Sequence, residues 1–219
     1  MISKLPRWVE YGSFILAFVA GLINAVGFLG FKHQSISHLS GTATLLGTGL
    51  TNSTFMDSSY LLFILVSFMM GSAISGFFLR NGALKLGRNY SLLLLLEAAL
   101  LILAAFFLTR DSLYGHYLAS AACGLQNALA TTYSGAVIRT THVTGIFTDL
   151  GLMMGAKLRG ERFDNRKAFL FLLIIAGFIT GGSLGAFAFN ELTFAALYIP
   201  ASICILSALS YAAYTAKMR

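Results

Sequence analysis

Charged residues are scarce in this sequence of 219 residues: only 11% are Asp, Glu, Lys or Arg, against about 25% in an ordinary soluble domain. Hydrophobic residues make up 57% of the chain. A soluble fold of this size would lack the polar side chains needed to cover its surface, and a disordered chain would not carry so many apolar residues. The composition excludes both classes and predicts an all-α polytopic membrane protein, with one domain over residues 1–219 and the lipid bilayer as partner.

Cysteines and catalytic motifs are equally sparse. Cys123 and Cys204 lie inside apolar runs without the spacing of a metal site or redox pair, so we interpret them as small buried hydrophobic side chains. The sequence has no phosphate-binding loop, nucleophile elbow or zinc-protease motif. We therefore predict no metal, no cofactor and no enzymatic activity. An intramembrane enzyme using His142 and Asp149 is disfavoured because the two residues are widely spaced.

Long apolar runs are what the sequence has in abundance. A bilayer core needs about 20 apolar residues per helix. Six segments meet that test: 9–31, 59–80, 91–109, 114–133, 168–189 and 192–215. Two further segments, 39–51 and 142–155, look helical but are short and rich in Ser, Thr and Gly. These two are either full spans or half-helices that enter and leave the membrane on one side.

The distribution of basic residues decides between those alternatives. If both short segments are re-entrant, only Lys32 and Arg110 of the 15 basic residues lie on the side opposite the N-terminus. Full crossing would move four more to that side: Arg80, Lys85, Arg88 and Arg139. Lys and Arg collect in cytoplasmic loops, so we predict six spans plus two half-helices with both termini cytoplasmic. The same rule accounts for the net charge of +7 without a nucleic-acid partner.

An internal repeat is visible in two pairs of matching windows. The pairs are Gly-Leu-Ile-Asn-Ala at 21–25 with Gly-Leu-Gln-Asn-Ala at 124–128, and Ser-His-Leu-Ser-Gly at 37–41 with Thr-His-Val-Thr-Gly at 141–145. The chain is therefore predicted to contain two copies of one unit, about 9–109 and 114–215. Each copy has three full spans, an odd number, so the second copy enters from the opposite side. This is an inverted-topology 3+3 repeat.

Small residues recur every four positions in both copies. Ser67, Gly71 and Ser75 in the first copy match Gly177, Gly181 and Gly185 in the second. Such faces let helices approach closely. They serve either packing between the two repeats or association of two chains, so a homodimer through these faces is one of the two predictions.

The two half-helices are predicted to begin near mid-membrane, where a helix start offers unpaired N–H groups and a partial positive charge. Facing starts favour a small anion or a polar solute. The alternative is that the nearby hydroxyls only cap the half-helices and join the repeats. The predicted substrate-binding residues belong to these starts and to the preceding helices: His38, Ser40, Gly41, Thr42, His142, Thr144, Gly145, Asn24 and Asn127.

Several of these residues have a second interpretation. Asn24 and Asn127 either line the pathway or brace the adjacent half-helix, because buried amides need hydrogen-bond partners. Asp149 and Glu97 are predicted as proton-coupling residues, since a carboxylate inside a membrane is costly and often functional. Their alternatives are pairing of Asp149 with Lys157 or Arg159, and pairing of Glu97 inside the bundle.

The windows 37–41 and 123–151, with the run Arg-Thr-Thr-His-Val-Thr-Gly at 139–145, resemble the YoaK-like family of bacterial inner-membrane proteins, known as domain of unknown function 1275. The resemblance covers nearly the whole chain. In that family the first motif commonly reads Ser-His-Met-Thr-Gly-Asn, whereas Thr42 stands here in place of the Asn. The resemblance implies a multi-pass protein of the bacterial plasma membrane and supplies no substrate.

These observations predict a small inner-membrane transporter or channel for a small anion or polar solute, with its site at the facing starts of the half-helices. The alternative is a non-transporting membrane assembly or regulatory module that uses the small-residue helix faces as its working surface.

Overall fold

The computed structural model describes residues 8–30, 37–52, 55–79, 89–133 and 140–217, and these residues are almost entirely helical. All eight segments predicted to be helical form helices, with ends a few residues from the predicted ones. In chain order the elements are α1 (Trp8–Gly30), α2 (Leu39–Asn52), α3 (Phe55–Phe78), α4 (Asn89–Leu108), α5 (Tyr114–Tyr133), α6 (Val143–Leu158), α7 (Asn165–Leu192), the 3₁₀ helix η2 (Thr193–Leu197) and α8 (Tyr198–Lys217).

Within the described part of the chain, four stretches are long and apolar enough to cross a membrane: Val9–Gly30, Ser58–Phe78, Asn89–Leu108 and Asn165–Lys217. The fourth contains α7, η2 and α8. These stretches support an all-helical membrane protein. The segment 114–133, predicted as a further span, forms α5 but is not among them. Because α5 packs against α1, α3 and α4, it can carry polar side chains that a lipid-facing helix could not.

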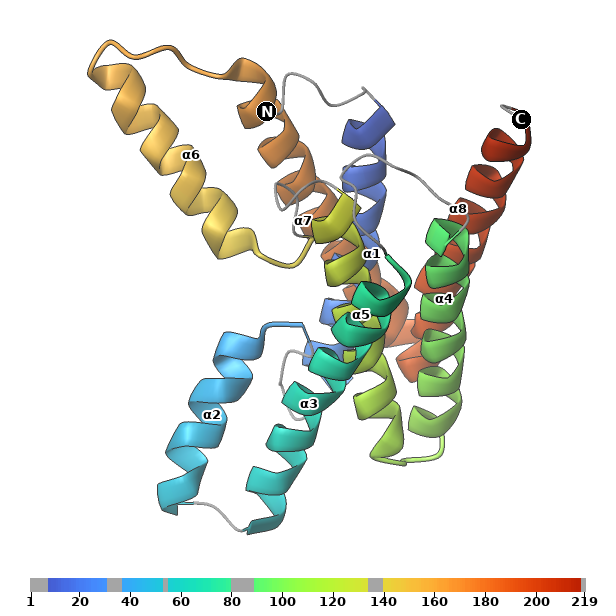
Figure 1. Cartoon of the computed structure of the whole chain (residues 1–219). Helices are drawn as coiled ribbons and strands as arrows, with labels where there is room; N and C mark the ends of the chain where they lie inside the picture. Colours follow the sequence, from blue (N-terminus) through green and yellow to red (C-terminus); the bar gives the residue numbers. More distant parts are fainter. Residues whose placement is uncertain (1–7, 31–36, 53–54, 80–88, 134–139, 218–219) are drawn as a thin grey trace.

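The long helices form a bundle in which α1 packs against α7, α3 against α5, and α4 against both α5 and α8 (Figure 1). Its core contains fully buried Leu22, Ile23 and Leu101, which belong to one apolar cluster. Large apolar side chains also cover the outside, since Phe77 is 80% exposed and Phe187 is 67% exposed. So much exposed apolar surface suits contact with lipid rather than water.

Helices α1 and α7 approach so closely that glycine is required where they cross. Gly21 of α1 lies against the backbone of Phe178, and Gly181 of α7 lies against the backbone of Phe18. A Cβ atom at either glycine would overlap a carbonyl group of the other helix. The crossing therefore depends on the absence of a side chain at both positions.

Helices α3 and α5 cross in the same manner. Gly124 of α5 lies against the backbone of Phe68, and Gly71 of α3 lies against the backbone of Ala121. The glycines of both predicted small-residue faces are thus occupied by packing within the chain. Association of two chains stays a prediction.

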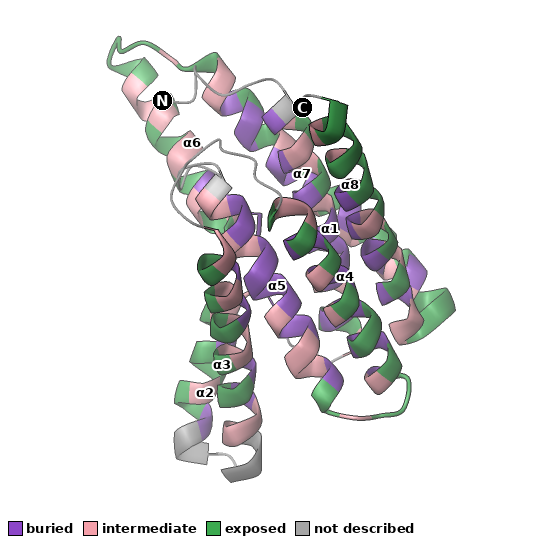
Figure 2. Ribbon diagram, turned by 45° about the vertical axis from the view of Figure 1, so that its right-hand side comes forward, coloured by how far each residue is buried: buried purple, intermediate pink, exposed green. Residues whose placement is uncertain are grey.

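The two short helices stand apart from this bundle. In Figure 1, α2 runs from the middle of the molecule to its lower end, and α6 runs from the middle to its upper end, so that their first turns lie nearest each other. Helix α2 contacts α3, and α6 contacts α7. Along α6 most residues are exposed or partly exposed (Figure 2), and Ile146 is the buried one. Neither short helix contributes much to the core.

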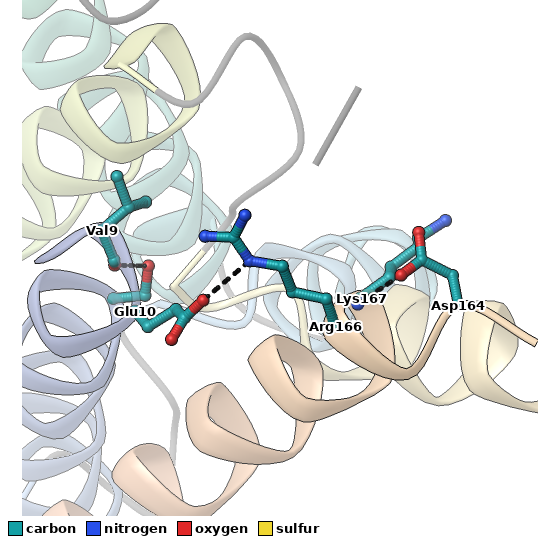
Figure 3. A network of polar contacts seen from close by, with 6 residues as sticks. Val9, Glu10, Asp164, Arg166 and Lys167 are labelled. Carbon is teal, nitrogen blue, oxygen red and sulfur yellow. Dashed lines mark hydrogen bonds and ion pairs between the residues drawn. The ribbon is translucent and has the colours of Figure 1, made fainter. Parts of the chain in front are cut away.

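A polar network ties together the first turns of α1 and α7 (Figure 3). The Arg166 Nε–H donates to Glu10 Oε1 at 3.0 Å, with the arginine side chain 32% exposed and the glutamate side chain 17% exposed. Asp164 caps α7 by accepting a hydrogen bond from the backbone N–H of Lys167 at 3.0 Å. A partly buried charged pair of this kind joins two segments far apart in sequence.

Replacing Arg166 by alanine is expected to lower the free energy of unfolding by about 1 kcal/mol, because the pair is partly screened by solvent. Glu10→Ala should have a similar effect, and the double variant should lose no more than either single variant. Thermal unfolding in detergent measures all three. Arg159→Ala is the control, since Arg159 pairs with Glu161 two residues away and both side chains are more than half exposed. A double variant that loses the sum of the two single effects would contradict the pairing.

Candidate functional site

A cavity of about 720 Å³, here called the central cavity, lies between the starts of α2 and α6 and the helices α3 and α5. Four parts of the chain that are distant in sequence therefore share it. Its lining residues are Ser37, His38, Leu39, Ser40, Phe68, Ser72, Gly76, Asn127, Ala128, Thr131, Thr132, Thr141, His142 and Thr144.

Most of the residues that line the central cavity have side chains that can form hydrogen bonds and carry no fixed charge. Seven hydroxyl side chains, two imidazoles and one amide contribute to it, together with a few apolar side chains. Among the described lining residues there is no Asp, Glu, Lys or Arg. A small solute held here would be bound by hydrogen bonds and by backbone dipoles rather than by an opposite side-chain charge.

The two short helices α2 and α6 both present their first turn at this cavity. His142 precedes α6, and its side chain makes no capping hydrogen bond. At α2, the N–H of Gly41 donates to the carbonyl of His38 at 3.0 Å, in a turn-like contact. The first N–H groups of a helix have no partner inside the helix, and they give the start a partial positive charge. Two such starts in one cavity favour a ligand that accepts hydrogen bonds.

His38 and His142 both line the central cavity, but their surroundings differ. The His38 ring is partly buried, with its centroid 5.9 Å from that of Phe178 on α7. The His142 side chain is exposed and lies over Gly145 of its own helix, where a Cβ atom would meet the imidazole ring. One histidine is therefore packed on the bundle, whereas the other is turned back onto α6.

Asn24 and Asn127 are also placed differently. Asn24 Oδ1 accepts a hydrogen bond from the Ser37 hydroxyl at 2.8 Å, so Asn24 braces the start of α2. Asn127 lines the central cavity, and its buried Oδ1 atom has no hydrogen-bond partner among the residues that the structure describes. The residue before it, Gln126, accepts at Oε1 from the Thr140 hydroxyl at 3.5 Å. The structure thus gives the two predicted roles, bracing and lining, to one asparagine each.

The remaining predicted residues of the half-helix starts divide into two groups. Ser40 and Thr144 line the central cavity, whereas Gly41, Thr42 and Gly145 do not. Thr42 is buried with 3% of its surface exposed. None of the described residues elsewhere in the chain comes within 4 Å of the position a Gly41 Cβ would take. The rotation of each short helix therefore selects which first-turn side chains reach the cavity.

Asp149 lies on α6 outside the central cavity. Its Oδ2 atom is 3.7 Å from the Lys167 ammonium on α7. The alternative prediction that Asp149 pairs with Lys157 or Arg159 is therefore wrong. The α6–α7 connection folds α7 back beside α6, which brings Lys167 to the carboxylate.

Glu97 lies in the core between α4, α5 and α8, away from the central cavity. It is fully buried, and among the described residues the Cys204 thiol is its hydrogen-bonding neighbour, in a geometry that leaves both carboxyl oxygens poorly satisfied. The thiols of Cys123 and Cys204 are its polar neighbours. Both cysteines are free and buried, as the sequence predicts. The structure does not bring Glu97 to the central cavity, so a proton-coupling role for it would act at a distance.

Several lining residues were missed by sequence reasoning. Ser72 and Gly76 lie one turn apart on α3, and Thr131 and Thr132 lie about one turn beyond Asn127 on α5. Helical spacing alone places Thr131 on the same face as Asn127, because residues four apart share a face. That signal could have extended the predicted site along α5. The residues on α3 could not be found without knowing that α3 packs beside α5.

Two further features of the described residues concern metal binding and a second cavity. No group of three His, Cys, Asp or Glu side chains is placed to bind a metal ion. A second cavity, of about 690 Å³, lies between α1, α8 and the start of α4. Its lining is mostly apolar and aromatic, including Phe14, Phe18 and Tyr214, and it contains none of the predicted site residues.

Comparison with known proteins concerns the whole helical bundle. No curated protein and no solved structure matches the chain. One family model, described as a protein of unknown function (DUF1275), matches residues 12–210. The narrower YoaK-like name stays a prediction. Since the match spans most of the chain and all eight α-helices, the protein belongs to the DUF1275 family.

Proposed function

We propose that the protein is a small membrane transporter or channel for a small anion or polar solute, which binds in the central cavity. The observation that carries the proposal is a hydrogen-bonding cavity of about 720 Å³ shared by the starts of two short helices, inside a chain of apolar helices. Polar groups in such surroundings are costly unless a ligand, water or protein partner satisfies them.

The proposed topology is six spans plus two re-entrant half-helices, arranged as an inverted 3+3 repeat. The opposite directions of α2 and α6 in Figure 1 support it. Contacts at matched positions support it as well: Gly21 lies against the backbone of Phe178, and Gly124 lies against the backbone of Phe68. Each contact joins the first helix of one copy to the third helix of the other, as a pseudo-twofold axis would require.

Two equivalent hydroxyl contacts support the proposal that α2 and α6 are matching parts of the two repeats. The Thr44 hydroxyl donates to the carbonyl of Ser40 at 2.9 Å, and the Thr148 hydroxyl donates to the carbonyl of Thr144 at 3.0 Å. The two pairs occupy equivalent places in the matched windows. Hydroxyls that bond to their own helix in this way need no lipid-exposed partner.

We place the protein in the bacterial inner membrane with both termini cytoplasmic. The start of α1, the end of α6, the start of α7 and the end of α8 all lie at the upper end in Figure 1. Basic residues belong to these same ends, with Lys157 in the last turn of α6 and Lys217 in the last turn of α8. An excess of Lys and Arg indicates the cytoplasmic side.

Flux measurements on the wild-type protein in liposomes test the proposal. The probes are chloride and formate for anions, and glycerol and urea for neutral solutes. We expect at least one of them to cross well above the rate of protein-free liposomes, and the class that crosses separates the dipole-based preference for anions from general hydrogen bonding. Wild-type vesicles that equal protein-free vesicles for all four probes would contradict a transport role for small solutes of these classes.

A further inference from the structure

The two matched half-helices are not docked in the same manner. In the first copy, the Ser37 hydroxyl donates to Asn24 Oδ1 at 2.8 Å and joins the start of α2 to α1. The matched residues of the second copy are Thr141 and Asn127. No such bond joins them, because Asn127 Oδ1 has no hydrogen-bond partner in the described part of the chain. The first copy therefore has a hydrogen bond between this pair of residues, whereas the second copy does not.

The histidines show the same difference. His38 packs against Phe178 of α7, with ring centroids 5.9 Å apart. The matched pair is His142 and Phe68, and both of these side chains line the central cavity. His142 is turned over Gly145 of its own helix. The residues just before α2 thus make a hydrogen bond and a ring contact with the bundle, and the matched residues just before α6 make neither.

The unpaired amide of Asn127 carries an energetic cost. Its Oδ1 atom is a buried acceptor without a hydrogen bond from any described residue, a condition that is rare in native structures. The side chain of Thr141, which is 7% exposed, lines the same cavity and carries a hydroxyl donor. Movement of the α6 start onto α5 would satisfy the amide and would reproduce the bond already present between Ser37 and Asn24.

We propose that the two pairs, Ser37 with Asn24 and Thr141 with Asn127, are alternating docking bonds that set which half-helix is closed against the bundle. The inference rests on the proposed function, because the pairs are equivalent only if the chain is an inverted repeat of a transporter. In the present state the start of α2 is docked on α1, the start of α6 is not docked on α5 although α6 contacts α7 further along, and the central cavity lies open beside α3 and α5. In the other state α6 docks and closes this cavity, while α2 leaves α1 and opens a matching cavity beside α1 and α7.

The reactivity of a cysteine in the central cavity tests the exchange without any transported solute. The reporter is Thr132→Cys in a background of Cys123→Ala and Cys204→Ala, reconstituted in lipid nanodiscs and alkylated by a charged thiol reagent. Asn24→Ala removes the bond of the present state, so we expect the alkylation rate to fall by up to about fivefold, because one ordinary hydrogen bond changes the equilibrium constant between the two states by about that factor. Ser37→Ala should lower it equally, and it replaces Asn24→Ala if that variant does not fold.

The matched variants should act in the opposite direction. Thr141→Ala removes the bond of the other state, so the alkylation rate should stay equal or rise. The double variant Ser37→Ala with Thr141→Ala should return to the rate of the reporter background, which simple destabilisation would not produce. Leu158→Cys, at a position 90% exposed at the end of α6, is the control and should react at one rate throughout.

The outcomes separate the docking bonds from the transport function. A rate unchanged by Asn24→Ala and Ser37→Ala, or a double variant that is slower than both singles, would overturn the alternating bonds even if the wild-type protein transports a solute. Opposite effects of the matched variants would support the alternating bonds even if none of the four probes crosses the membrane.

Discussion

Replacing Gly76 by phenylalanine is expected to reduce solute flux by about tenfold or more, with little change in stability. Gly76 lines the central cavity, and within the described ranges no other part of the chain lies within 4 Å of the position its Cβ would take. A ring added there therefore enters the cavity instead of the packed core. Overlap with a passing solute that adds about 1.4 kcal/mol to the barrier lowers the rate tenfold. Liposome flux with the probe that the wild-type protein carries measures the effect.

A matched control distinguishes obstruction from a general effect of the added ring. Gly151 of α6 also has open space around its Cβ position, and it does not line the central cavity. Gly151→Phe should therefore keep most of the wild-type flux. Thermal unfolding should show both variants folded. If Gly76→Phe carried solute as fast as Gly151→Phe, the pathway would not run through the central cavity.

The positions of the helices could be predicted from the sequence because bilayer thickness fixes the length of an apolar run. All eight predicted segments form helices. What the sequence could not supply is which helix is enclosed by the others. Helix α5 carries Gln126 and Asn127, so it falls short of the hydropathy of a lipid-facing span, yet its burial on several sides lets it keep those amides.

The approximate position of the central cavity could also be predicted. Matched Ser-His and Thr-His windows mark where each short helix begins, and His38 and His142 do line one cavity. Individual side chains were less predictable, because neighbouring residues on a helix point about 100° apart. Ser40 and Thr144 reach the cavity, whereas Gly41 does not. That difference depends on the rotation of each half-helix against the bundle, which no local pattern specifies.

Partners across helices were the least predictable feature. The sequence offers Lys157 or Arg159 as partners for Asp149, because Asp149 could lie near the cytoplasmic end of its short helix. The structure pairs Asp149 with Lys167 instead, at 3.7 Å. This contact depends on how the α6–α7 connection returns the chain. The same limit applies to the hydrogen bond between Ser37 and Asn24, which forms only once the residue just before α2 has been brought back beside α1.

Replacing Gly181 by alanine is expected to destabilise the protein by about 1–3 kcal/mol or more, because overpacking displaces backbone as well as side chains. A Cβ at this position would overlap the carbonyl of Phe18, and a backbone group cannot move aside as a flexible side chain can. For a chain of this size, each kcal/mol corresponds to about 2–4 °C of melting temperature. Thermal unfolding in detergent should show a clear decrease.

The adjacent glycine is the control for this substitution. A Cβ at Gly182 would lie 3.7 Å from the carbonyl oxygen of Gly21, an ordinary contact. Gly182→Ala should therefore unfold within about 1 kcal/mol of the wild-type protein, since alanine is the better helix former. Equal melting temperatures for Gly181→Ala and Gly182→Ala would contradict the close approach of α1 and α7.

The same experiment on α3 tests whether the two crossings are equivalent. Gly71 lies against the backbone of Ala121 as Gly181 lies against that of Phe18, and Gly76 supplies a control with open space around it. Gly71→Ala should therefore lose about as much stability as Gly181→Ala, and Gly76→Ala should lose little. An inverted repeat requires this agreement, because a pseudo-twofold axis relates the crossings. A large loss of stability in only one of these two variants would contradict the equivalence of the two helix crossings.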